Sequence, residues 1–250
     1  MESLNLRQIA LVAADLDAVR AELAEVFGID HFHVDPGVAK FDLRNIVCAL
    51  GRTFLEVVSP IVESTSAGRL LEKRGGDGGY MVIVQTSDLA AARSRILSGG
   101  ARIVAEHDHG GAAYLHIHPR DTGAALLSFD YMDSPDRWDW AGVDWQSHTQ
   151  PSVAIAGVHL QASDAAAVAQ RWGEMAGREP QGAGQEWRIA LDSGEVTFGL
   201  ILDGRGEGLQ AITLATPEAD AIRKRAAARG LLRTDGAIEI CGTVFHLVSG

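Results

Sequence analysis

Residues 6–28 read LRQIALVAADLDAVRAELAEVFG, which is an apolar strand, an acidic helix start, an alanine-rich helix and a final glycine. Three later stretches repeat this order of elements: GYMVIVQTSDLAAARSRILSGG (79–100), IAGVHLQASDAAAVAQRWGEMAG (155–177) and LQAITLATPEADAIRKRAAARG (209–230). Self-similarity of this kind is the signature of a repeated supersecondary unit. The sequence therefore predicts four copies of one unit.

The helix of each repeat is predicted from the spacing of its apolar residues and from its ends. In the first repeat, Leu16, Val19, Leu23 and Val26 recur at helical spacing, so one face of that helix is apolar. Hydroxyl residues that precede the later helices are predicted N-caps, and these are Ser87, Ser163 and Thr216. A glycine is predicted to end each helix, because glycine tolerates the left-handed backbone of a helix C-cap.

Strand-like runs follow each helix. They are residues 31–34, 40–50 and 53–58 in the first repeat, 102–105, 113–118 and 124–131 in the second, 186–191 and 195–202 in the third, and 237–240 and 243–248 in the fourth. One helix and about four strands per repeat predict an α+β fold. A single repeat would leave one sheet face uncovered, so we expect the repeats to pair into an N-terminal domain at 1–132 and a C-terminal domain at 152–250.

A tryptophan-rich connector, residues 133–151, joins the two expected domains. It contains Trp138, Trp140 and Trp145, which are three of the five tryptophans of the chain. A flexible linker would be rich in glycine and serine. Two interpretations are open: the connector packs against the domains, or it forms an aromatic lid over a ligand pocket.

The charge of the chain limits its partners. The formal net charge is −11, and a nucleic acid or an anionic membrane requires a basic face. The longest apolar runs are only as long as strands, so no segment is expected to span a bilayer. We therefore expect a small-molecule ligand, no nucleic-acid or membrane partner, and a monomer or homodimer.

The expected location is the cytoplasm. The first residues lack the basic segment and apolar block of a signal peptide. Cys48 and Cys241 each lie in an apolar, strand-like run, which predicts buried free thiols in a reducing compartment. A disulfide between them is the alternative.

The repeated strand–helix starts, with FLEVVSP at 54–60 and LHIHPRDTGAALLSFD at 115–130, resemble the vicinal oxygen chelate superfamily. Its members include glyoxalase I, methylmalonyl-CoA epimerase, extradiol dioxygenases and bleomycin-resistance proteins. The resemblance implies that paired βαβββ units form cup-shaped mixed sheets. It also implies a divalent metal (Zn, Mn, Fe, Co or Ni), held by one residue from the first strand and one from the last strand of each unit, which polarises vicinal oxygens of the substrate.

The resemblance assigns ligand positions residue by residue. In the N-terminal half these positions hold Gln8 and Glu56, which are apt ligands, and Met81 and Ser128, which are poor ones. In the C-terminal half only His246 could ligate, so that half is expected to be a degenerate copy. The usual set of four ligands is therefore incomplete in both halves.

Other polar residues in apolar strands are further candidates, because a buried polar group needs a partner. His116, in the middle of a strand, is a candidate metal ligand or acid, whereas His118 is interpreted as a turn residue. Asn45, Ser128 and Tyr80 are candidate binding residues. Glu56 between Leu55 and Val57 is either paired, poised as a base, or an outward-facing strand residue.

Two functions are compatible with these residues, one enzymatic and one non-catalytic. By resemblance, the chain is an isomerase, epimerase or lyase that removes a proton next to a carbonyl in the N-terminal cup. Glu56 would be the base or a metal ligand, Gln8 a ligand or orienting group, and His116 a ligand or acid. The alternative is a non-catalytic protein that binds or sequesters a small molecule, as bleomycin-resistance proteins do.

Overall fold

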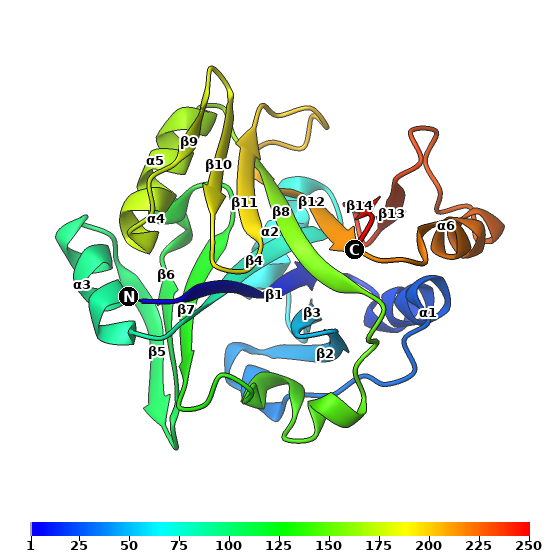
Figure 1. Cartoon of the computed structure of the whole chain (residues 1–250), viewed down its shortest axis with the longest axis horizontal. Helices are drawn as coiled ribbons and strands as arrows, with labels where there is room; N and C mark the ends of the chain where they lie inside the picture. Colours follow the sequence, from blue (N-terminus) through cyan, green and yellow to red (C-terminus); the bar gives the residue numbers. More distant parts are fainter. Residues whose placement is uncertain (1) are drawn as a thin grey trace. The chain divides into compact units, whose positions relative to one another are not determined.

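The computed structural model describes residues 2–250 (Figure 1). The strands are β1 (Leu4–Val12), β2 (Leu43–Leu50), β3 (Thr53–Pro60), β4 (Gly78–Thr86), β5 (Ile103–His109), β6 (Ala112–Ile117), β7 (Leu126–Met132), β8 (Ala154–Gln161), β9 (Gln181–Ala183), β10 (Glu186–Ala190), β11 (Glu195–Gly199), β12 (Gly208–Ala215), β13 (Ile238–Ile240) and β14 (Thr243–Val248). The α-helices are α1 (Leu16–Phe27), α2 (Ser66–Arg74), α3 (Leu89–Ser98), α4 (Pro119–Thr122), α5 (Ala165–Ala176) and α6 (Ala219–Ala228), and the 3-10 helices are η1 (Pro36–Phe41), η2 (Asp139–Ala141) and η3 (Trp145–Ser147).

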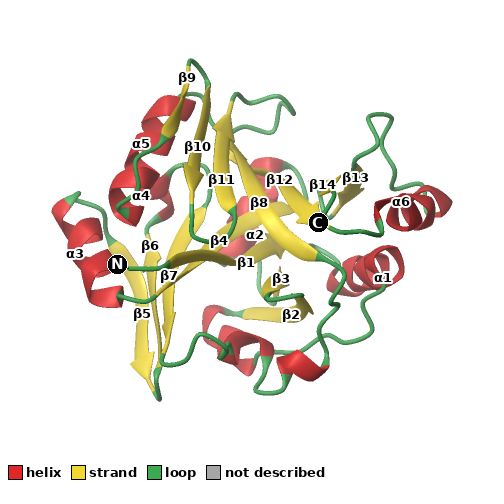
Figure 2. Ribbon diagram, in the orientation of Figure 1, coloured by secondary structure: helices red, strands yellow, loops and turns green. Residues whose placement is uncertain are grey.

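The strands form two seven-stranded sheets. One has the order β2-β3-β1-β4-β7-β6-β5, and the other has the order β13-β14-β12-β8-β11-β10-β9. Both sheets are mixed, since β4–β7 and β8–β11 pair in parallel whereas β6–β7 and β10–β11 pair antiparallel. Figure 2 distinguishes the strands from the helices that connect them. The predicted α+β class with two mixed sheets is confirmed.

Each repeat uses the same connection. Its first strand runs into a helix, and its last strand returns parallel to the first, as the registers of β4–β7, β8–β11 and β12–β14 show. A parallel return needs a crossover, and the alanine-rich helix is part of it. The apolar residues Leu16, Val19, Leu23 and Val26 predicted for α1 are all buried in the structure.

The expected strand at 31–34 is wrong. The structure has only one bridge there, between His33 and Val47, and η1 follows from Pro36. Pro36 has no N–H group to give to a ladder, and the Asp35 side chain accepts a hydrogen bond from the Gly37 N–H, which favours a tight helical turn. The run predicted at 40–50 accordingly starts as a strand only at Leu43.

Two of the predicted helix N-caps are displaced by one residue. Asp88 and Asp164, not the serines before them, accept hydrogen bonds from the N–H groups of Ala91 and Ala167. Thr216 accepts from the N–H of Glu218, the residue before α6. A carboxylate is favoured over a hydroxyl here because it also interacts with the positive end of the helix dipole.

The backbone of the described chain divides into two compact units. The α3–α5 unit contains residues 2–8, Met81–Arg137 and Gly157–Leu209, and the α1–α6 unit contains Ile9–Tyr80, Trp138–Ala156 and Gln210–Gly250. One sheet lies within residues 4–132 and the other within 154–248, so each unit includes strands of both sheets. The expected domains at 1–132 and 152–250 stay a prediction.

Each compact unit is held by contacts between elements that are distant in sequence. In the α3–α5 unit, the indole N–H of Trp172 donates to the carbonyl of Thr122 at 2.8 Å. In the α1–α6 unit, Nε of Arg225 donates to the carbonyl of Val26 at 2.7 Å, and the Phe27 and Phe245 rings lie 5.3 Å apart. These contacts join a helix of one repeat to another repeat.

The tryptophan connector packs within the α1–α6 unit. The ring of Trp138 stacks on Phe54 of β3 at a centroid distance of 5.7 Å, and Trp145 meets the same ring edge-on at 5.0 Å. Trp138 and Trp145 are both buried. This geometry is that of a packed connector.

Both cysteines are buried, and the helices are short or polar. Cys48 and Cys241 are buried free thiols, as predicted, and burial raises the pKa of Cys48 to about 12. In residues 2–250, no helix combines the length and the apolar character that crossing a membrane would require.

Candidate active site

The β2–β3 hairpin places Asn45 and Glu56 on one face of its sheet. Asn45 lies opposite Val58, and Val47 lies opposite Glu56. Because side chains alternate along a strand, Asn45, Val47, Glu56 and Val58 all point to the same side. Asn45 is 2% exposed and Glu56 is 8% exposed, so the outward-facing interpretation of Glu56 is wrong.

A chain of two hydrogen bonds orients the Glu56 carboxylate. The Asp35 backbone N–H donates to Oδ1 of Asn45 at 3.1 Å. A backbone N–H can only donate, so the Asn45 atom that faces it must be the oxygen. The amide nitrogen Nδ2 then points to Glu56 and donates to Oε1 at 2.6 Å. Asn45 therefore fixes one oxygen of the Glu56 carboxylate.

Tyr80 lies within electrostatic reach of Glu56. Burial raises the pKa of Tyr80, the hydrogen bond with Ser66 lowers it, and the negative charge of Glu56 adds to the rise. The Tyr80 hydroxyl lies 2.9 Å from Oγ of Ser66, on α2. At neutral pH Tyr80 thus keeps its proton and can act as a hydrogen-bond donor.

Apolar groups border the Glu56 carboxylate along β3. Phe54 lies two residues before Glu56 and packs on Trp138, and Val58 lies two residues after it, in a buried cluster with Val12 and Leu43. The residues two positions before and after Glu56 on this face are therefore apolar. A buried, hydrogen-bonded carboxylate with apolar neighbours is a suitable general base.

A second group of polar side chains lies in the α3–α5 unit. His116 of β6 is directly opposite Ser128 of β7, and Tyr114 is directly opposite Asp130. The Ser128 hydroxyl donates to the Asp130 carboxylate, and both residues are fully or almost fully buried. The rings of Tyr114 and His116 stack at 4.2 Å.

Asp130 and Tyr114 were not among the predicted site residues. Asp130 follows Ser128 by two positions in LLSFDYM, so the alternation of the strand already places both on one face. The alternation of side chains along this strand is thus the sequence signal that places Asp130 beside Ser128. Tyr114 has the same relation to His116, but a tyrosine in a strand is ordinarily a packing residue.

The predicted residues fall into two groups. Asn45, Glu56 and Tyr80 lie in the α1–α6 unit, whereas Gln8, His116 and Ser128 lie in the α3–α5 unit. His118 Nδ1 accepts from the Arg120 N–H at the start of α4, so His118 is a turn residue, as interpreted. The roles expected for Gln8, His116 and Ser128 stay predictions.

The expected metal-ligand set of Gln8, Glu56 and His116 stays a prediction. In residues 2–250, no three His, Cys, Asp or Glu side chains are grouped so that they could hold a metal ion. The predicted ligand Glu56 is bonded to Asn45, and the predicted ligand His116 stacks on Tyr114. We therefore derive no catalytic step through a metal.

Comparison with known proteins agrees with this architecture. Residues 9–177 match the glyoxalase-like domain family. An ethylmalonyl-CoA/methylmalonyl-CoA epimerase from Cereibacter sphaeroides is 26% identical over 137 residues, which are 51% of this chain and 98% of the epimerase.

Two solved structures share the fold over nearly the whole chain. A hypothetical protein from Staphylococcus aureus is 13% identical, with a TM-score of 0.70 over 99% of this chain and 100% of its own. A triple mutant of 4-hydroxymandelate synthase from Streptomyces coelicolor is 18% identical, with a TM-score of 0.72 over 94% of this chain and 78% of its own. At these identities the likeness concerns the fold alone. With its match over residues 9–177, the chain belongs to the glyoxalase-like domain family of the vicinal oxygen chelate superfamily.

Proposed function

We propose that the chain is an isomerase of the epimerase type, and that Glu56 removes a proton from a carbon next to a substrate carbonyl. The observation that carries the proposal is the buried Glu56 carboxylate, held by the Asn45 amide at 2.6 Å. The relation to an ethylmalonyl-CoA/methylmalonyl-CoA epimerase supports it, because an epimerase must break and remake such a C–H bond. Members of this superfamily bind small molecules, and we propose an acyl thioester as the substrate class.

The proposed step needs only a base and a group that stabilises the product anion. Glu56 takes the proton, and the C–H electron pair moves onto the carbonyl oxygen to form an enolate. Asn45 donates to Oε1 and so orients the Glu56 carboxylate that accepts the proton. Return of a proton to the opposite face of the planar enolate gives the epimer. Tyr80 is our proposal for a hydrogen-bond donor to the substrate, and the role expected for His116 stays a prediction.

Isotope exchange tests the proposal directly. Racemic methylmalonyl-CoA is incubated with the protein in D2O, and loss of the α-proton is followed by NMR. We expect exchange with the wild-type chain and a loss of at least about 100-fold in Glu56→Gln, which keeps the shape but removes the base. Glu106→Gln is the matched control, since Glu106 is an exposed strand carboxylate. Equal exchange rates in wild type and Glu56→Gln would overturn the role of Glu56.

The incomplete set of family ligands, with Met81 and Ser128 at two positions, favours the second candidate, a non-catalytic binding protein. Trp138 and Trp145 on Phe54 would report its ligand. The aromatic group lies on the same face of β3 as Glu56. A ligand that binds there would change tryptophan fluorescence without undergoing exchange. Saturable quenching by methylmalonyl-CoA, with no deuterium incorporation in any condition, would replace the enzyme proposal by this one. The free thiols Cys48 and Cys241 support a cytoplasmic location for either function.

A further inference from the structure

A cavity of about 680 Å³ lies in the α3–α5 unit, over strands β8 to β11. The proposed base Glu56 is not among the residues that line this cavity. Its volume is in the range of small-molecule sites in proteins. His246, the one candidate ligand that the resemblance gave the C-terminal half, is not among the residues that line this cavity.

The floor of the cavity is a row of polar side chains across the sheet. Thr197 of β11 is in register with His159 of β8 on one side and with Arg188 of β10 on the other. Arg188 is in turn in register with Gln181 of β9. Phe198, the residue after Thr197, packs on Trp172 of α5, so alternation directs the polar row to the face away from that helix.

His159 is held in place at one end of the row. Its Nδ1 lies 2.9 Å from Oγ1 of Thr197, and that hydroxyl donates to the Val158 carbonyl at 3.2 Å. Gly199 makes room for the imidazole, since a Cβ there would lie 2.8 Å from Cε1 and 3.0 Å from Nε2 of His159. The glycine therefore allows the ring to lie flat against the cavity floor.

Arg188 supplies the positive charge of the row. Its guanidinium donates to Oε1 of Gln181 at 3.1 Å, and the Glu195 carboxylate lies 3.9 Å away, beyond hydrogen-bond distance. A guanidinium has five N–H donors in a planar fork that matches a carboxylate. The Arg188 side chain is 56% exposed, so a ligand in the cavity can reach it.

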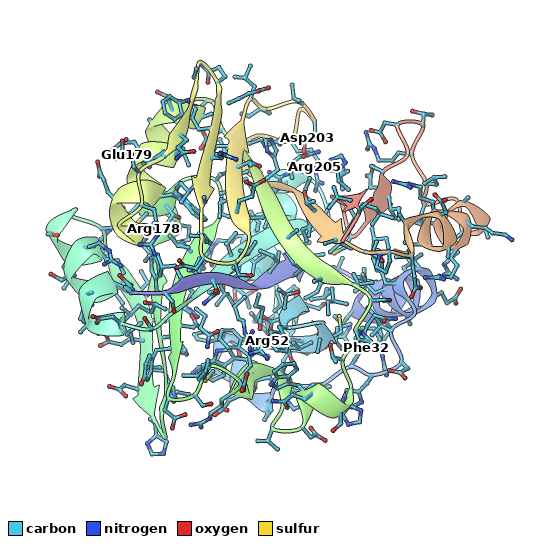
Figure 3. All side chains as sticks on the ribbon, in the orientation of Figure 1. Phe32, Arg52, Arg178, Glu179, Asp203 and Arg205 are labelled. Atoms are coloured by element: carbon cyan, nitrogen blue, oxygen red, sulfur yellow. The ribbon has the colours of Figure 1, made fainter. Side chains whose placement is uncertain are left out.

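The rim of the cavity is apolar. Leu200 and Leu202 line it and are 47% and 83% exposed, and Trp187 lines it from β10. Exposed leucines next to a pocket are typical of a surface that a ligand covers. Gln161 holds the loop that bears them, because its Nε2 donates to Asp203 at 2.5 Å and to the Gly206 carbonyl at 2.8 Å. Figure 3 shows Asp203 and Arg205 on this loop, between β11 and β12.

The geometry points to a second binding site, in which the cavity takes a small monocarboxylate with a hydrocarbon chain. The carboxylate pairs with Arg188 in the polar row, next to Thr197 and His159. The hydrocarbon chain covers Leu200, Leu202 and Trp187. The ligand thus matches a polar floor that carries one cation and an apolar rim.

Octanoate is the probe, and the Trp187 indole is the reporter. The indole N–H of Trp187 donates to the Gly184 carbonyl at 2.9 Å, and its NMR signal is assigned from Trp187→Phe. We expect octanoate to shift this signal saturably. Octan-1-ol should bind at least about 10-fold more weakly, because it lacks the charge that pairs with Arg188.

Arg188→Met is the decisive variant, since it removes the guanidinium and keeps an unbranched apolar side chain. It should weaken octanoate binding at least about 10-fold and leave octan-1-ol binding unchanged. Arg102→Met is the control, because Arg102 lies in the same unit, is 58% exposed and is also ion-paired. No shift of the Trp187 signal by octanoate, equal affinity for acid and alcohol, or an unchanged affinity in Arg188→Met would each overturn the proposal.

Discussion

Nδ2 of Asn45 donates a 2.6 Å hydrogen bond to Oε1 of Glu56, from the neighbouring strand of the same hairpin. Glu56 lies two positions from Val58, the register partner of Asn45, so the amide reaches the carboxylate diagonally. Asn45 is itself held by the Asp35 N–H at 3.1 Å. The proposed base is therefore positioned by one hairpin and the segment just before it.

Asn45→Ala should destabilise the protein and slow the proposed exchange reaction. It leaves a buried carboxylate without its amide donor and the Asp35 N–H without its acceptor, which costs about 1–3 kcal/mol of unfolding free energy. Urea unfolding measures the stability, and exchange in D2O measures the rate. Asn45→Asp should fall further in stability at pH 8 than at pH 4, because it places a second carboxylate beside Glu56. Equal losses at both pH values would contradict the pairing.

Trp138→Ala should be among the most destabilising changes in the connector. Trp138 is buried and stacked on Phe54, and removing such a ring costs about 3–5 kcal/mol. Trp140→Ala is the matched control, since Trp140 is only half-buried and should cost less. Thermal unfolding of the two variants makes the comparison. Similar losses in both would show that the Phe54 stack contributes little.

Stability should fall at alkaline pH through Cys48. Burial raises the pKa of this thiol from 9.0 to about 12 in the folded chain. Below pH 9 the Cys48 thiol keeps its proton in both the folded and the unfolded chain, so its contribution to the stability of the fold is fully present. Between pH 9 and 12 the unfolded chain loses the proton and the folded chain keeps it, so stability decreases by up to about 1.4 kcal/mol per pH unit.

Urea unfolding between about pH 8.5 and pH 10.5 checks the Cys48 prediction. In Cys48→Ala the pH slope should be smaller than in wild type, whatever the absolute stability of that variant. A thiol reagent should also leave folded Cys48 unmodified at pH 8, because the thiolate is the reactive form. An identical pH slope in both proteins would contradict the effect of burial on Cys48.

Removal of divalent metals should leave the proposed exchange reaction unchanged. The expectation follows from the donor groups, since Glu56 is bonded to Asn45 and no metal-ligand cluster occurs in the part of the chain that the structure describes. Elemental analysis and dialysis against EDTA check it. Stoichiometric metal that is lost in both Gln8→Ala and Glu56→Ala would instead show that these two residues share an ion.

Much of the local structure could be predicted from the sequence. The period of Leu16, Val19, Leu23 and Val26 predicts α1, and these residues are buried. The polar interruptions of apolar strands identified Asn45 and Glu56, which the structure joins by a hydrogen bond. Both results rest on periods of two or 3.6 residues, which are local properties of the backbone.

Other local features were missed because a competing preference won. The segment 31–34 alternates like a strand, but Asp35 and Pro36 start a 3-10 helix immediately after it. Helix α2 at Ser66–Arg74 was missed because it is a short, mostly polar segment with few apolar residues. Asp130 lies at the end of an apolar strand, where a carboxylate ordinarily marks the start of a loop.

The sequence by itself determined the repeated unit and its helices, because each depends on neighbours a few positions away, whereas the burial of Glu56 came from the structure. Only the tertiary structure decided that α1 packs with α6 and α3 with α5, through contacts such as Arg225 with Val26 and Arg95 with Met175. It also brought His159, Thr197, Arg188 and Gln181 into one row, from four strands. Four similar repeats offer similar apolar faces, so their partners are chosen by long-range packing and strand register, which local periodicity does not contain.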